Sequence, residues 1–122
     1  MDKIPVLVLD DEEAITRLTD AVLTMHGFDV TESNDPLKAL EMVKVRKFRL
    51  IMVDILMPGM TGIEFIRAAR QTDMNCETKY AVLSAKRMNE EERREIFDLG
   101  AELMTKPFVP QRLVEKVQGL LA

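Results

Sequence analysis

The most informative stretch of the sequence is residues 50–62, which reads LIMVDILMPGMTG. Its first four residues are all apolar, which is typical of a central β-strand covered on both faces. Asp54 follows this run directly, and the turn-rich segment 58–62 leads into a helical pattern. A carboxylate at the end of a buried strand is costly to desolvate unless it is paired or binds a cation. Asp54 is therefore the first candidate functional residue.

The same pattern of an apolar run followed by a polar residue occurs elsewhere in the chain. Asp10 and Asp11 follow the run 6–9, Ser84 follows 80–83, and Lys106 follows 103–105, while 28–32 is a weaker run without such a residue. Runs of this kind alternate with segments of helical period, which predicts an α/β fold built from βα units around a parallel sheet.

The helical segments carry start and stop signals. Asp35-Pro36 and Asn89 are expected N-caps, and Gly27 and Gly100 are expected C-terminal stops. The last helix is expected to begin at Pro110. In the first helix, the apolar residues predicted to face the core are Ala14, Ile15, Leu18, Val22 and Met25.

The polar residues after the strands form a set suited to phosphoryl chemistry. In a sheet of order 2-1-3-4-5 the first and third strands are neighbours, so Asp10, Asp11 and Asp54 converge at one edge. Three close carboxylates require a counter-charge, which a hard divalent ion such as Mg²⁺ supplies. Lys106 and Ser84 add an ammonium and a hydroxyl that suit a phosphoryl group on Asp54, with the carboxylate as nucleophile.

These motifs resemble those of a receiver domain of the two-component response regulators, over essentially all of residues 1–122. Asp54 and Ser84 are 30 residues apart, and Ser84 and Lys106 are 22 apart, as in that family. The resemblance implies a flavodoxin-like, doubly wound (βα)5 fold with a five-stranded parallel sheet of order 2-1-3-4-5. The matching segments are Leu9-Asp10-Asp11-Glu12, Val53 to Gly62, Ser84-Ala85 and Lys106-Pro107-Phe108.

The resemblance also implies a function. Asp54 would accept a phosphoryl group from a sensor histidine kinase or a histidine phosphotransfer protein, and the change would be transmitted to a downstream effector domain or target protein. Asp11, Asp54 and the backbone carbonyl of Leu56 would ligate Mg²⁺, with Asp10 acting mainly through coordinated water. Ser84 and Lys106 would hold the phosphoryl oxygens, and the bond between Lys106 and Pro107 would be cis.

By the same resemblance, the protein is not an enzyme with a separate substrate but a receiver that catalyses its own phosphorylation and slow dephosphorylation. Slow hydrolysis is expected because Leu56 and Lys86, which flank the path of an attacking water, offer neither a carboxylate nor an amide to orient it. The chain departs from the family at Leu103, where many receivers have an aromatic residue. Counting forward from Gly100 selects Met104 instead, which is not aromatic either.

Composition limits the other classes of function. The chain of 122 residues fits one domain, and its net charge of −4 with mixed acids and bases argues against direct binding to nucleic acid. Cys76, the single cysteine, cannot form an internal disulfide, and no apolar stretch approaches the roughly 20 residues that span a bilayer. A cytoplasmic location without membrane contact is expected.

Two other functions remain open on sequence grounds. A phosphatase resembling the haloacid dehalogenase superfamily uses similar residues, but its nucleophile lies in an Asp-x-Asp pattern after the first strand, which Asp10-Asp11-Glu12 lacks. A phosphate-independent interaction module would keep the fold without the chemistry, and the intact acidic set argues against it.

Overall fold

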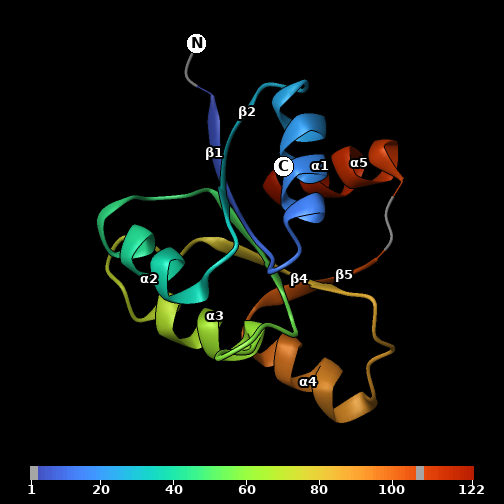
Figure 1. The fold of residues 1–122 in the computed structure, drawn as a ribbon. Helices are drawn as coiled ribbons and strands as arrows, with labels where there is room; N and C mark the ends of the chain where they lie inside the picture. The colour runs from blue at the N-terminus through green and yellow to red at the C-terminus, as the bar shows by residue number, and fades with distance from the viewer. Residues whose placement is uncertain (1–2, 107–108) are drawn as a thin grey trace.

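The computed structural model describes residues 3–106 and 109–122 as one parallel five-stranded sheet with helices on both faces (Figure 1). The strand order is β2-β1-β3-β4-β5, which confirms the predicted doubly wound topology. The strands are β1 (Ile4–Leu9), β2 (Phe28–Ser33), β3 (Leu50–Asp54), β4 (Lys79–Ser84) and β5 (Ala101–Thr105). The helices are α1 (Glu13–Thr24), α2 (Pro36–Val45), α3 (Gly62–Arg70), α4 (Glu90–Asp98) and α5 (Pro110–Leu121). No helix in the described part of the chain has the length and apolar composition that crossing a bilayer requires.

The sheet separates two apolar clusters. On one face α2, α3 and α4 pack against strand residues such as Leu7, Ile51 and Val82, and on the other face α1 and α5 pack against Val6 and Leu50 (Figure 1). Alternation of side chains along each strand supplies both faces, which is why the central runs are continuously apolar. The edge strand β5 begins two residues before the predicted run, because only alternate residues of an edge strand need burial and Glu102 is exposed.

The predicted helix boundaries are confirmed. Asp35 caps α2 by accepting a hydrogen bond from the Leu37 backbone N–H, and Asn89 caps α4 in a capping box with Glu92. Gly27 and Gly100 have φ values of 88° and 72°, as expected for residues that end helices in the left-handed region.

The predicted core face of α1 is partly wrong. Thr16, Thr19 and Leu23 are the buried residues of this helix, whereas Leu18 and Met25 are exposed, as is Ala14. The Thr16 hydroxyl donates a hydrogen bond to the Glu13 carbonyl at 3.0 Å, whereas the buried Thr19 hydroxyl has no hydrogen-bond partner among the described residues. Ile15 and Val22 lie at the sides of this face. They are half-buried, so the prediction that they face the core is confirmed only in part.

Candidate functional site

The predicted site residues meet at the carboxyl edge of the sheet. Asp54 and Ser84 are the last residues of β3 and β4, and Asp10 and Lys106 directly follow β1 and β5. Hydrogen bonding continues past the end of β5, since the Lys106 backbone N–H donates to the Ser84 carbonyl at 2.7 Å. Four segments distant in sequence therefore present their polar groups on one edge, as expected for open α/β sheets.

Lys106 lies between the carboxylates of this edge. Its Nζ is 2.5 Å from Asp10 Oδ2, 3.2 Å from Asp54 Oδ1 and 3.7 Å from Glu12 Oε1. The side chains of Lys106, Asp10 and Asp54 are 7%, 0% and 9% exposed. A single buried ammonium thus faces two buried carboxylates, and their negative charge is only partly compensated.

The three aspartates have the geometry of a cation site. One carboxylate oxygen from each of Asp10, Asp11 and Asp54 lies within 4.8 Å of the others. Asp11 is exposed while Asp10 and Asp54 are buried, so the cluster opens to solvent on one side. Oxygen ligands with room for water are what Mg²⁺ prefers, and the donor set fits that ion.

The pKa shifts of this edge reflect burial first and neighbouring charge second. Burial raises the pKa of Asp54, and the neighbouring charge of Asp10 raises it further, while Lys106 opposes both effects. Burial also raises the pKa of Asp10, against the hydrogen bond from Lys106. For Lys106, burial lowers the pKa, but the hydrogen bond to Asp10 and the surrounding carboxylates outweigh burial and the net shift is upward. A further cation is therefore favoured at this edge.

A small cavity of about 190 Å³, called the acceptor cavity because Asp54 is the expected acceptor, opens at the Asp54 carboxylate. Asp11, Asp54, Ser84 and Lys106 line it, so four of the predicted residues face one space, and Asp10 lies beneath them. Leu56, whose main chain was expected to ligate the ion, also lines this cavity, and its side chain is exposed. The other described lining residues are Glu12, Ile55, Ala85 and Lys86.

Ser84 is held by the residue two positions after it. Its hydroxyl donates to the Lys86 carbonyl at 2.9 Å and accepts from the Lys86 backbone N–H at 3.0 Å. Ser84 is almost completely buried. Its hydroxyl must therefore give up the Lys86 carbonyl in order to donate to a group on Asp54.

Close backbone contact positions the loop after Asp54. The Gly62 backbone N–H donates to the Ile55 carbonyl at 2.9 Å, and a Cβ at Gly62 would lie 2.5 Å from the Asp54 carbonyl oxygen. Thr61 caps α3 in a capping box with Glu64. The loop 55–61 is thus fixed at both ends, and only glycine fits where it closes onto β3.

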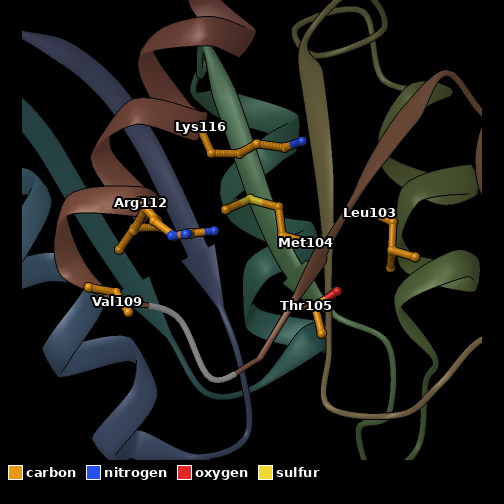
Figure 2. A pocket seen from close by; sticks show the side chains of 7 residues that line it. Leu103, Met104, Thr105, Val109, Arg112 and Lys116 are labelled. Atoms are coloured by element: carbon orange, nitrogen blue, oxygen red, sulfur yellow. The ribbon is translucent and has the colours of Figure 1, made fainter.

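Leu103 and Met104 lie on opposite faces of the edge strand, as Figure 2 shows. Leu103 pairs with Val82 and packs in the cluster with α4, on the face that Ser84 shares by alternation, whereas Met104 lies in the cluster with α5. Leu103, and not Met104, therefore lies on the face of the sheet that Ser84 occupies. The wider cavity in Figure 2, about 560 Å³ between β5 and α5, is lined by none of the predicted site residues in the described part of the chain.

Two contacts of the site were not predicted. Glu12 approaches Lys106, and Asn34 donates from Nδ2 to the Asp10 carbonyl at 2.8 Å. Lys86, which was expected to lie beside Asp54, lines the same cavity. The sequence could have indicated Glu12, because it adjoins Asp10 and Asp11. It contained no signal for Asn34, which comes after the weak run 28–32. The predicted cis bond before Pro107 lies outside the described residues.

The comparisons with known proteins agree with one another. Residues 6–118 match the response regulator receiver domain family. The chain is 30% identical over 117 residues to the phosphate regulon transcriptional regulatory protein PhoB of Pseudomonas aeruginosa, covering 95% of this chain and 51% of that protein. It is 33% identical over 118 residues to the alkaline phosphatase synthesis transcriptional regulatory protein PhoP of Bacillus subtilis, covering 95% and 48%. The chain thus spans about half the length of these curated relatives.

A solved structure also covers almost the whole chain. The chemotaxis protein CheY4 of Vibrio cholerae has a TM-score of 0.91 and 30% identity, covering 98% of this chain and 99% of that one.

Proposed function

The chain belongs to the response regulator receiver domain family, and from that premise we propose that it accepts a phosphoryl group on Asp54 and thereby changes the surface it offers to a partner. The observation that carries the proposal is the position of Asp54, which lies beside the buried Lys106 ammonium, belongs to a cluster of three aspartates and lines one small cavity. The family favours this function over a haloacid-dehalogenase-like phosphatase and over a phosphate-independent module.

The proposed reaction is a phosphoryl transfer. An oxygen of the Asp54 carboxylate forms a bond to phosphorus while the bond between phosphorus and the histidine nitrogen of the donor breaks, and the imidazole leaves with that electron pair and takes up a proton. Lys106 faces the oxygens of the transferring group because its Nζ already lies 3.2 Å from Asp54 Oδ1. The Ser84 hydroxyl donates a hydrogen bond to a phosphoryl oxygen once it no longer donates to the Lys86 carbonyl.

We propose Mg²⁺ as the cofactor, held by Asp11, Asp54 and the backbone carbonyl of Leu56, with Asp10 acting through water. When bound, the ion supplies positive charge that compensates the acidic cluster and the phosphoryl oxygens. Burial raises the pKa values of Asp10 and Asp54 against the opposing effect of Lys106, so a further cation would favour their ionised forms, which supports this assignment.

The proposed partners are a sensor histidine kinase or a histidine phosphotransfer protein on the donor side and an effector domain or target protein on the output side. The relatives that carry this domain in chains of twice its length are described as transcriptional regulators. Direct contact of this domain with nucleic acid or membrane is not part of the proposal, and the cytoplasmic location expected from the sequence stays a prediction.

Acetyl phosphate with Mg²⁺ tests the acceptor assignment. Intact mass spectrometry is expected to show one added phosphoryl group on the unmodified protein and none on Asp54→Asn. The same addition is expected to be lost when Mg²⁺ is replaced by a chelator. Retention of the added mass in Asp54→Asn would show that another residue is the acceptor.

A further inference from the structure

Lys86 connects the acceptor cavity with α4. It lines the cavity together with Asp54, and its Nζ donates to Glu92 Oε2 at 2.7 Å. The other oxygen of that carboxylate, Oε1, accepts the backbone N–H of Asn89 at 3.1 Å and so completes the cap of α4. One carboxylate thus joins a residue of the cavity rim to the start of a helix.

The backbone of Lys86 is also connected to the acceptor cavity. It exchanges two hydrogen bonds with the Ser84 hydroxyl. A Ser84 hydroxyl that turns to a phosphoryl oxygen gives up the Lys86 carbonyl, which loosens the turn carrying Lys86. When the Ser84 hydroxyl turns, the backbone of Lys86 is therefore held less tightly.

Charge decides where the Lys86 ammonium then goes. Phosphorylation replaces the single negative charge of the Asp54 carboxylate with about two on the phosphoryl oxygens, whereas Lys106 is already shared among Asp10, Asp54 and Glu12. The Lys86 side chain is 49% exposed in its ion pair with Glu92. Exposed pairs of this kind contribute little stability, so the ammonium can exchange one anion for a more highly charged one.

We propose that Lys86 is a second phosphoryl-binding cation of this site, held by Glu92 in the unphosphorylated protein and transferred to the phosphoryl oxygens when Asp54 is phosphorylated. The inference rests on the proposed function of Asp54. In the phosphorylated protein Glu92 keeps its bond to Asn89 but loses Lys86. The start of α4 then loses its ion pair with Lys86, which couples the chemistry to the surface of that helix.

Binding of beryllofluoride with Mg²⁺, a mimic of the phosphoryl group, tests the proposal in three single variants and one double variant. Lys86→Gln removes the cation, and Glu92→Gln removes the ion pair while leaving an oxygen that can still cap α4. Arg67→Gln is the matched control, because Arg67 forms a 2.7 Å ion pair with Glu95 of α4 outside the acceptor cavity. Thermal unfolding without the mimic checks that each variant is folded.

We expect Lys86→Gln to weaken binding of the mimic about fivefold, the equivalent of one exposed charge pair. Glu92→Gln is expected to tighten binding when Lys86 is present and to have no effect in the Lys86→Gln background. Arg67→Gln is expected to bind as the unmodified protein does.

Two results would overturn the inference while leaving the acceptor assignment intact. One is unchanged affinity in Lys86→Gln, and the other is an effect of Glu92→Gln that persists without Lys86. If the unmodified protein itself neither bound the mimic nor gained a phosphoryl group, both the proposed function and this inference would be wrong.

Discussion

Replacement of Gly62 by alanine tests how the loop 55–61, which follows Asp54, is held in place. The added Cβ would lie 2.5 Å from the Asp54 carbonyl oxygen and 3.0 Å from the Ile55 Cα, and both neighbours are backbone atoms that cannot rotate away. Reaching an ordinary contact distance requires the start of α3 and the end of β3 to separate by roughly 1 Å, an overpacking that costs about 2 to 3 kcal/mol. Alanine recovers at most about 1 kcal/mol through its higher helix propensity.

The net loss for Gly62→Ala is therefore about 1 to 2 kcal/mol, which corresponds to a midpoint about 4 to 8 °C lower for a chain of this length. Gly119→Ala is the control, because this glycine also lies in a helix but nothing is within 4 Å of its added Cβ. The control is expected to keep or raise the midpoint. Thermal unfolding by circular dichroism measures both, and beryllofluoride binding is expected to weaken only in Gly62→Ala. A Gly62→Ala protein as stable as Gly119→Ala would refute the close-contact argument.

Three other predictions concern the chemistry and its readout. Self-dephosphorylation of Asp54 is expected to take many minutes to hours. Leu56→Asn should accelerate it about tenfold, which is less than a general base would achieve, because an amide only orients water. Loss of the label within seconds in the unmodified protein would contradict this prediction. The raised pKa of Asp54 favours the folded state at pH values below the ordinary pKa of 3.8, and this contribution is lost as pH rises through the raised pKa. Urea unfolding without Mg²⁺ should therefore show that Asp54→Asn gains stability relative to the unmodified protein from pH 4 to 7. A stability difference that stays constant over this range would argue against the prediction. Hydrogen exchange with beryllofluoride and Mg²⁺ should change most in residues 85–89 and the start of α4, and a change largest at 103–105 would show that Leu103 carries the signal instead.

The sequence was sufficient to predict the sheet and the site edge because both depend on simple patterns. Buried parallel strands are apolar at every position, and a charged residue directly after such a strand can lie only at its end. Asp54, Ser84 and Lys106 could be placed for this reason, without knowledge of any contact between them. Their distances and the partners of Lys106 required the structure.

The sequence was insufficient where burial depends on the neighbouring element. In α1 the apolar pattern favoured Leu18 and Met25 as core residues, but the sheet packs against Thr16 and Leu23 instead. The Thr16 hydroxyl is satisfied within the helix, so polarity alone does not exclude a threonine from the interior. Lys86 likewise lies in a loop whose contacts with Ser84 and Glu92 no periodicity could indicate.

The separation of the interior into two clusters by the sheet has a consequence for how this domain can diverge. A substitution beneath α3, such as one at Phe65, and a substitution beneath α5, such as one at Leu113, alter different clusters that share no packed side chains. Effects on stability at such unconnected sites are expected to add rather than to couple. Each layer of helices can therefore acquire new surface residues, and the repacking they require, without compensating changes in the other layer.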